Sequence, residues 1–341
     1  MLPVPASGAD TSNRCPQCHG LVDGLYRNMR DRLFDAPGVR ALASCDVCSV
    51  VWLVPRPSTD ELPAFYKTYF THGDEFIDAP AGARTNPFIA AALARMGYRT
   101  AAGTLASLVA HVPQVFDACA GYAYWLPHVP GGTLLDVGCG DGRHLRQTQT
   151  LGWRVTGLEP DPIAAEVART RYGLDVRTDD LHSLPDASFD AVVMHHVVEH
   201  LPDYPLALRE ATRVLRPGGH CVVVTPNTRS LGRRMFGRAW VHWDPPRHLQ
   251  LFSPPSLEAA LIESGLVSVR VWTTARNARF AGSASLEIRR SRNERASAGP
   301  PGLPRRVAGL LFQATEHALL AVHASAGEEL VARGRRPDAA V

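Results

Sequence analysis

The chain has 341 residues, of which 45% are hydrophobic and 20% are charged, and its formal net charge is +3. This length is that of about two domains, and the apolar fraction excludes an intrinsically disordered chain. The small net charge gives no sign of a nucleic-acid or membrane partner, and no stretch reaches the roughly 18 apolar residues of a membrane span. Residues 1–13 have neither a basic start nor an apolar centre, so we expect no secretion signal and a cytoplasmic location.

Four of the seven cysteines form two closely spaced pairs. Cys15 and Cys18 make the first pair, Cys45 and Cys48 make the second, and 26 residues separate the pairs. Each pair offers two thiolates from one tight turn, and two such turns complete a tetrahedral zinc site. Two disulfides are the alternative, but they require an oxidising compartment for which the sequence gives no signal. We therefore predict a structural Zn²⁺ bound by these four cysteines in a zinc ribbon.

The pattern becomes helical after the ribbon. Ser58 and Glu61 are typical of a helix start, and residues 88–126 are rich in alanine with apolar residues at helical spacing. The predicted segments are a flexible tail at 1–13, the zinc ribbon at 14–57, a helical bridge or cap at 58–130, and an α/β domain at 131–336 with a mobile insertion at 283–306.

Short apolar runs alternate with amphipathic stretches from Thr133 onward. This alternation is typical of an α/β fold with a parallel sheet. The insertion is predicted from its content of Arg, Ser, Gly and Pro. The predicted strands are 133–137, 153–158, 174–178, 189–195, 220–225, 267–273 and 328–334. The predicted helices are 142–151, 161–171, 204–215, 256–264 and 306–323.

The most informative motif follows the first of these strands. Asp136 stands near the end of the strand, and glycines follow at 138, 140 and 142. Glycines let the backbone turn sharply and let a ligand lie against it. The spacing is not the GxGxxG of dinucleotide sites, and Glu159 ends the next strand, where a carboxylate accepts bonds from ribose hydroxyls. With Asp180 after the third strand, the pattern predicts a site for a nucleoside that carries an amino-acid tail.

Residues 134–226 resemble the core of class I S-adenosylmethionine-dependent methyltransferases. The resemblance rests on LLDVGCGDGRHL, VTGLEPD, DDLHSLPDASFDAVVMHHVVEHLPD and LREATRVLRPGGHCVVVTPN. The paired cysteines and the segment WVHWDPPRHL are similar to a bacterial subgroup with an N-terminal four-cysteine zinc ribbon. The resemblance implies a Rossmann-like seven-stranded methyltransferase sheet with S-adenosyl-L-methionine as cofactor. The residues that it places at the cofactor are Asp136, Gly138, Cys139, Gly140, Gly142, Glu159, Pro160, Asp180, Leu181 and His195.

The resemblance also implies methyl transfer to a small-molecule acceptor, such as a hydroxyl of a saccharide, an envelope precursor or a secondary metabolite. C-methylation of a nucleotide sugar is one alternative, and a non-catalytic cofactor-binding or scaffold protein is another. The intact glycine loop and Glu159 favour the enzyme. The sequence does not indicate the oligomeric state.

A hydroxyl acceptor needs a base, and histidine is the usual one near neutral pH. We expect the base among His200, His242 and His248, which follow the fourth and fifth strands of the domain; each of His200 and His248 could equally be a structural anchor. His196, Glu199 and His200 are similar to a metal-binding pattern of ubiquinone-pathway O-methyltransferases. That pattern has an acid in place of His196, so we expect no catalytic metal.

The loop after the fifth strand is rich in arginine and tryptophan. Trp240, Trp243 and Arg247 are predicted to contact the acceptor, because indoles stack on rings and arginine binds carboxylate or phosphate. The alternative is a lid whose tryptophans close the core. We expect no nucleic acid as partner, because aspartates offset the arginines of the ribbon.

Overall fold

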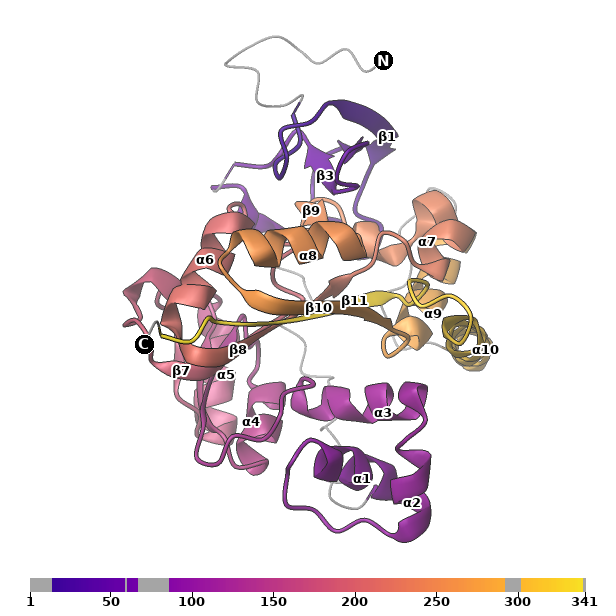
Figure 1. Ribbon diagram of the computed structural model, residues 1–341. Helices are drawn as coiled ribbons and strands as arrows, with labels where there is room; N and C mark the ends of the chain where they lie inside the picture. Colours follow the sequence, from indigo (N-terminus) through magenta and orange to yellow (C-terminus); the bar gives the residue numbers. More distant parts are fainter. Residues whose placement is uncertain (1–13, 59, 67–85, 292–301, 340–341) are drawn as a thin grey trace.

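The computed structural model describes residues 14–58, 60–66, 86–291 and 302–339, and a seven-stranded sheet forms its centre (Figure 1). The strand order is β10-β11-β8-β7-β4-β5-β6, and β11 is antiparallel to both of its neighbours. The strands are β4 (Thr133–Val137), β5 (Arg154–Leu158), β6 (Val176–Arg177), β7 (Phe189–His195), β8 (Leu215–Pro226), β10 (Val267–Thr274) and β11 (Glu329–Arg335). All seven strands predicted for the α/β domain are therefore present.

Alternating side chains of the sheet supply two separate cores. Leu135, Val192 and Val223 pack on one face, against α6 (Tyr204–Val214) and α8 (Pro254–Glu263). The opposite face packs against α4 (Arg143–Thr150) and α5 (Pro162–Tyr172) and against the end of the helical bridge. Successive residues of a strand point to opposite faces, so buried runs without polar residues are covered by helices on both sides.

The remaining helices cover the ends and one side of the sheet. Helices α4 and α5 follow β4 and β5 in the order expected for parallel strands joined by crossovers. The helices are α1 (Pro87–Arg95), α2 (Thr104–Val109), α3 (Pro113–Ala120), α4 (Arg143–Thr150), α5 (Pro162–Tyr172), α7 (Leu231–Phe236), α9 (Ala278–Arg290) and α10 (Leu303–Leu320), with short 3-10 turns at Leu62–Phe65, Gly121–Ala123, Leu181–Ser183, Gly237–Ala239 and Val241–Trp243.

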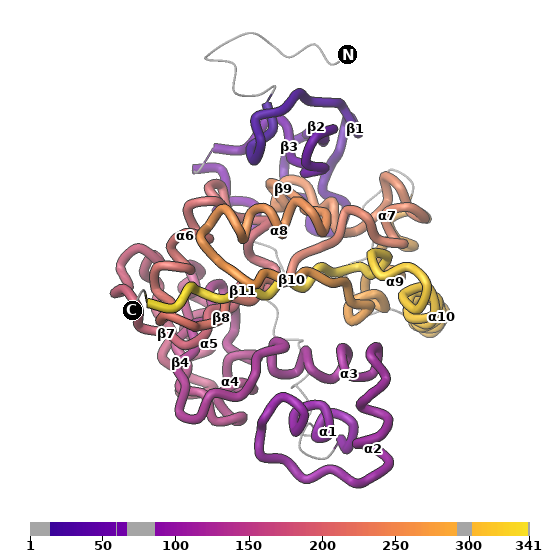
Figure 2. Tube along the Cα trace, viewed as in Figure 1, coloured from indigo at the N-terminus to yellow at the C-terminus, as the bar shows by residue number. Residues whose placement is uncertain are grey.

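The N-terminal segment forms a second sheet that shares a strand with the α/β domain. Its order is β1-β2-β3-β9, and β9 comes from the loop that follows β8 (Figure 2). Trp52 in β3 pairs with Gln250 in β9, and Val51 pairs with Leu251. The strands are β1 (Val22–Met29), β2 (Arg40–Cys45), β3 (Val51–Val54) and β9 (Gln250–Leu251). The cysteine-bearing segment is thus joined to the α/β domain through β9, a strand about 200 residues away in the sequence.

The predicted mobile insertion at 283–306 is wrong in its first part and at its end. Residues 283–290 belong to α9, where Ser283 and Ser285 are buried, and α10 begins at Leu303. Small residues let α9 pack closely on α10, which periodicity alone did not reveal: a side chain at Gly282 would clash with Phe312. The predicted tail at 1–13, part of the predicted helical bridge at 67–85, and residues 292–301 of the predicted insertion lie outside the described residues.

Within the described residues, none of the helices combines the length and the apolar character that crossing a bilayer requires.

Candidate active site

The glycine loop joins β4 to α4 at the carboxyl edge of the sheet. Gly138, Gly140 and Gly142 all have positive φ, at +72°, +57° and +78°. A Cβ at Gly138 would lie 2.5 Å from Val197, whereas a Cβ at Gly140 would meet no atom within 4 Å. Gly138 therefore permits close packing, and Gly140 leaves half-buried backbone with room in front of it. This combination suits a ligand that lies against the main chain.

Glu159 connects the end of β5 to this loop. The backbone N–H of Gly140 donates to Oε2 of Glu159 over 2.8 Å, and the N–H of Asp161 donates to Oε1 over 2.9 Å. The carboxylate is only 7% exposed, so the two bonds fix its orientation beside the loop. A carboxylate oxygen can accept more than one hydrogen bond, so accepting from these N–H groups is compatible with accepting from hydroxyl donors of a ligand.

Asp136 lies at the base of the same loop. Tyr124 donates from its hydroxyl to Oδ2 of Asp136 over 3.2 Å, while Oδ1 has no hydrogen-bond partner among the described residues. Burial, with a smaller contribution from Glu159, raises the pKa of Asp136 to about 7. A buried oxygen without a donor is unfavourable. An ammonium group of a ligand would satisfy this oxygen and return the carboxyl to its charged form.

The other predicted cofactor residues border this edge. Asp180 caps the 3-10 turn at Leu181–Ser183 by accepting from the N–H of His182, and Leu181 is buried beneath it. His195 ends β7, and its ring lies 5.8 Å from that of Tyr124. Cys139, which is 9% exposed, and Pro160 lie beside the glycines and Glu159. All ten predicted residues thus belong to the carboxyl ends of β4, β5, β7 and the turn after β6.

The predicted catalytic histidines form one cluster beside this edge. The rings of His200 and His248 lie 4.7 Å apart, and Nδ1 of His248 is 2.7 Å from the backbone oxygen of His242. His242 is stacked on His196 at 6.4 Å. Contacts between rings continue from His196 through His195 to His144 and Tyr124, which reaches Asp136. The cluster is therefore continuous with the glycine loop.

His196 differs from its neighbours because two carboxylates hold it. Its Nδ1 lies 3.1 Å from Oε1 of Glu199, and its Nε2 lies 2.7 Å from Oε1 of Glu329. Burial opposes the charged ring, but these bonds prevail and raise the pKa of His196 to about 10. The pKa of Glu199 falls to about 2, since His196 outweighs its burial. His196 is thus an imidazolium at neutral pH and does not serve as a base.

His200 and His242 are in the opposite state. Burial, reinforced by His248, lowers the pKa of His200 to about 4. Burial, reinforced by His196, lowers the pKa of His242 to about 3. Both rings are neutral at pH 7 and carry a nitrogen lone pair. His200 places its Nδ1 2.9 Å from the hydroxyl of Tyr66, and Nε2 of His242 has no hydrogen-bond partner among the described residues.

The pH dependence of stability should report the charge on His196. A folded-state pKa raised from 6.5 to about 10 gives a stabilisation that is complete below pH 6.5 and is lost as the pH rises through 10. Denaturant unfolding between these values should show a smaller decline for His196→Gln than for the wild type. The matched control is His111→Gln, at an exposed loop position. Parallel pH profiles for wild type and His196→Gln would contradict the charged pair.

Comparison with known proteins agrees with this geometry. Residues 113–271 match the family model described as a methyltransferase domain. The chain contains a class I S-adenosylmethionine-dependent methyltransferase domain. The sequence resemblance implied a Rossmann-like seven-stranded sheet, and the structure has a seven-stranded α/β sheet.

Two curated relatives and one solved structure illustrate the similarity. A malonyl-[acyl-carrier protein] O-methyltransferase from Serratia marcescens is 39% identical over 37% of this chain and 49% of its own length. A ubiquinone biosynthesis O-methyltransferase from Chelativorans is 32% identical over 40% of this chain and 60% of its own length. The chain thus spans about half the length of the curated relatives that it matches. A SAM-dependent methyltransferase from Thermotoga maritima aligns with 67% of this chain and 94% of its own, at 20% identity and a TM-score of 0.43.

The residues predicted to contact the acceptor are all buried in the methyltransferase structure. Trp240 and Trp243 are each 1% exposed and pack on each other with ring centroids 5.0 Å apart. Arg247 is fully buried, with NH1 donating to Asp31 over 2.8 Å and Nε donating to Asp244 over 2.9 Å. The structure therefore places Arg247 in a structural role, tying the ribbon to this loop, instead of the predicted acceptor contact.

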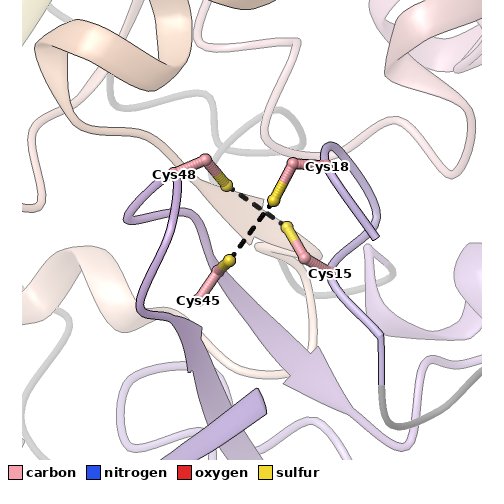
Figure 3. Close-up of side chains that lie close together, drawn as sticks. All are labelled: Cys15, Cys18, Cys45 and Cys48. Carbon is pink, nitrogen blue, oxygen red and sulfur yellow. Dashed lines mark hydrogen bonds between the residues drawn. The ribbon is translucent and has the colours of Figure 1, made fainter. Parts of the chain in front are cut away.

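The four cysteines of the ribbon converge on one point (Figure 3). Sγ of Cys15 lies 3.3 Å from Sγ of Cys48, Sγ of Cys18 lies 3.4 Å from Sγ of Cys45, and all four sulfurs are within 4.8 Å of one another. These separations exceed the roughly 2.05 Å of a disulfide. Both turns close in the same way, with the N–H of His19 bonded to the oxygen of Cys15 and that of Ser49 bonded to the oxygen of Cys45. The donor set and its shape fit a tetrahedral metal.

The site also contains residues that sequence reasoning missed. Tyr66 is one of them, and its hydroxyl lies 2.9 Å from Nδ1 of His200. Glu329 belongs to a predicted strand, but its position opposite His196 depends on the pairing of β11 with β8. Tyr124 lies outside the quoted motifs, and His144 belongs to LLDVGCGDGRHL but was assigned no role. Ring contacts through these residues would have required a three-dimensional fold to predict.

Proposed function

We propose that the protein transfers a methyl group from S-adenosyl-L-methionine to a hydroxyl of a small-molecule acceptor. The observation that carries this proposal is the glycine loop with Glu159 fixed beside it and an open space in front of Gly140. The names of the two curated relatives describe O-methyltransferases, which supports oxygen as the acceptor atom. A saccharide, an envelope precursor or a secondary metabolite fits the class.

The chain's own residues would hold the cofactor as follows. The loop of Gly138, Gly140 and Gly142 would support its amino-acid end, where Oδ1 of Asp136 has no hydrogen-bond donor among the described residues. Glu159 would accept from the ribose hydroxyls, and Asp180 with the Leu181 backbone would flank the adenine. When bound, the cofactor supplies an electrophilic methyl group on a sulfonium. The protein contributes alignment of the acceptor, exclusion of water and removal of its proton.

We infer that a neutral histidine removes that proton. His200 and His242 are both uncharged at neutral pH, and both lie in the cluster that continues from the cofactor edge. The charged His196, held by Glu199 and Glu329, would fix the loop that carries His200. His248, with its Nδ1 beside the His242 backbone oxygen, would hold the backbone that carries His242 in place.

The base can be tested at His200. His200→Gln should keep cofactor affinity and lower the turnover rate constant at neutral pH by about 10²-fold or more, because glutamine does not accept a proton. The wild-type rate should fall as the pH drops toward 4, where His200 itself becomes protonated, so the difference between the two proteins should shrink there. His111→Gln serves as the control. Equal rates at neutral pH would exclude His200 as the base.

The acceptor is best sought by direct turnover. Wild-type protein and S-adenosylmethionine are incubated with a panel of sugar nucleotides and pathway intermediates, and products are examined by mass spectrometry. A product heavier by one methylene unit in one acceptor class establishes the activity, and fragmentation shows whether oxygen carries the methyl group. A product methylated on carbon would contradict the O-methyl assignment.

We further propose that the ribbon places this protein in the zinc-ribbon subgroup. Elemental analysis of protein purified without chelators should find about one zinc per chain, bound by Cys15, Cys18, Cys45 and Cys48. Cys45→Ser should lose the metal and loosen the ribbon. Cys119→Ser, which changes a cysteine outside this group, should retain it. Zinc-free wild-type protein would contradict the site.

A further inference from the structure

Helix α10 has a second apolar face, on the side that points away from α9. Its inner face packs on α9, where Phe312 is 6% exposed and a Cβ at Gly309 would lie 2.6 Å from the backbone oxygen of Arg279. The outer positions recur every three or four residues, as one face of a helix does. They lie along α10 and the two residues that follow it, and all are exposed and apolar: Leu303, Val307, Leu310, Leu311, Ala314, Ala318, Ala321 and Val322.

The outer face of α10 is large and open to solvent. Leu303 is 74% exposed, Leu311 is 64% exposed and Val322 is 79% exposed. Single exposed apolar side chains are normal on a protein surface, whereas a continuous apolar patch marks a site that contacts a partner or a membrane. α10 has 18 residues, a length of about 27 Å, and it lies at the edge of the molecule (Figure 1). The packing of α10 on α9 does not account for these residues, because they point away from it.

Arginines of α9 border this outer face. Arg279, Glu287 and Arg290 follow one another at helical spacing along one side of α9. A Cβ at Gly309 would lie 3.3 Å from Cγ of Arg279, and Oε2 of Glu287 lies 3.6 Å from Nε of Arg305. This side of α9 therefore follows α10, and it places Arg290 beside the first turn of α10. Both Arg279 and Arg290 are exposed.

The exposed charge of this region is positive. Residues 276–291 and 302–324 contain two carboxylates, Glu287 and Glu316. Glu287 is half-buried and paired with Arg305, and Glu316 is fully buried. The exposed ionised side chains of these two segments are all arginines: Arg276, Arg279, Arg289, Arg290 and Arg306. The net charge of +3 for the whole chain does not reveal this local excess, which attracts an anionic partner.

An anionic lipid surface matches both the apolar face and its charge. A helix with an apolar face bordered by arginines lies in the plane of a bilayer interface, with its apolar side chains between the head groups. The aliphatic stems of the arginines cover apolar surface while their guanidiniums reach the lipid phosphates. A second copy of the chain matches less well, because a symmetric contact would bring the same arginines together from both sides. A convex helix also needs no groove in its partner when that partner is a fluid surface.

We propose that α10 attaches the protein to an anionic lipid bilayer, with its outer apolar face inserted at the interface and the bordering arginines on the lipid phosphates. The attachment is peripheral, since the helix stays packed on α9 through Phe312 and Gly309. Neither the glycine loop nor the histidine cluster contributes a residue to this face. The proposal therefore goes beyond the proposed methyl transfer, and the two can be tested separately.

Cosedimentation of the full-length protein with lipid vesicles tests the proposal. One set of vesicles contains equal parts of phosphatidylcholine and phosphatidylglycerol, and the other contains phosphatidylcholine alone. Wild type should bind the anionic vesicles about tenfold or more tightly than the neutral ones, and added salt should weaken that binding. The double variant Leu310→Gln/Leu311→Gln should bind the anionic vesicles about tenfold or more weakly, because two inserted apolar side chains are lost.

Matched controls separate this face from the rest of the surface. Ile262→Gln is the control for the leucines, since Ile262 is 55% exposed on α8. The double variant Arg279→Gln/Arg290→Gln should also weaken binding to the anionic vesicles. Arg154→Gln, at an exposed arginine of β5, should leave that binding unchanged.

Three results with vesicles would overturn the proposal. These are absence of wild-type binding to the anionic vesicles, equal binding to both kinds of vesicle, and equal binding by the leucine variant and Ile262→Gln. Light scattering without vesicles adds a fourth. A wild-type dimer that the leucine variant converts to a monomer would show that a second copy covers this face, and it would also overturn the lipid proposal.

Discussion

Replacing Arg247 by methionine should lower the free energy of unfolding by about 3–5 kcal/mol. The guanidinium is fully buried and pairs with Asp31 of the ribbon and Asp244 of the loop. Methionine fills much of the volume but leaves both carboxylates buried without their cation. An uncompensated buried charge is among the largest effects of a single substitution. Urea unfolding, monitored by circular dichroism, measures the loss of stability. A variant that does not fold at all would show the same destabilisation in its most severe form.

The control for this variant is Arg154→Met. Arg154 is exposed and donates to the backbone oxygen of Gly131, so its loss should change the free energy of unfolding by no more than about 0.5 kcal/mol. Arg247→Met as stable as Arg154→Met would contradict the anchoring role. The anchor also matters to the site, because Nδ1 of His200 lies 3.2 Å from the backbone oxygen of Arg247. Loss of the anchor should therefore disturb the base as well as the ribbon.

The second large effect is expected at Glu159. Glu159→Ala should weaken S-adenosylmethionine binding by about ten- to a hundredfold, since bonds between a carboxylate and ribose hydroxyls contribute about 1.5–3 kcal/mol. The variant also removes the acceptor that fixes the N–H groups of Gly140 and Asp161. Both losses act in the same direction. Calorimetry on protein whose circular dichroism matches the wild type gives the dissociation constant.

Glu166→Ala is the matched control for Glu159→Ala. The Glu166 side chain is 62% exposed on α5 and pairs with Arg169, so its removal should leave cofactor affinity unchanged. If Glu159→Ala binds the cofactor as tightly as Glu166→Ala, the ribose assignment is refuted. Glu159→Gln keeps the size of the side chain and exchanges one acceptor oxygen for a donor. Its affinity should fall between those of the wild type and the alanine variant.

The α/β domain could be predicted from sequence because its signals are local. The strands 133–137 and 189–195 match β4 and β7 at both ends, since each is a short, mainly apolar run flanked by polar or glycine residues. The glycines at 138, 140 and 142 occupy the left-handed conformations that glycine favours. The two cysteine pairs were also recognisable, because the spacing within each pair specifies its turn.

The partners of the active-site residues could not be predicted in the same way. Asp31 and Arg247 are 216 residues apart in the sequence, and no sequence pattern connects them. They come together only because β9 pairs with β3 of the N-terminal sheet. An arginine in a polar loop has the same sequence signature whether it is solvated or buried between two aspartates. Glu329 faces His196 only because β11 inserts antiparallel beside β8. Contacts that depend on strand order cannot be predicted without the three-dimensional fold. The charge on His196 depends on such a contact, the one with Glu329.

The claim that the glycine loop and Glu159 form a cofactor site is tested most directly by isothermal titration calorimetry of the wild-type protein. S-adenosylmethionine and its demethylated product, S-adenosylhomocysteine, are titrated separately into the same preparation. The proposed site predicts one binding event per chain for each ligand, with the product competing against the cofactor when both are present. Absence of binding for both ligands, in protein whose circular dichroism shows that it is folded, would contradict the methyltransferase assignment.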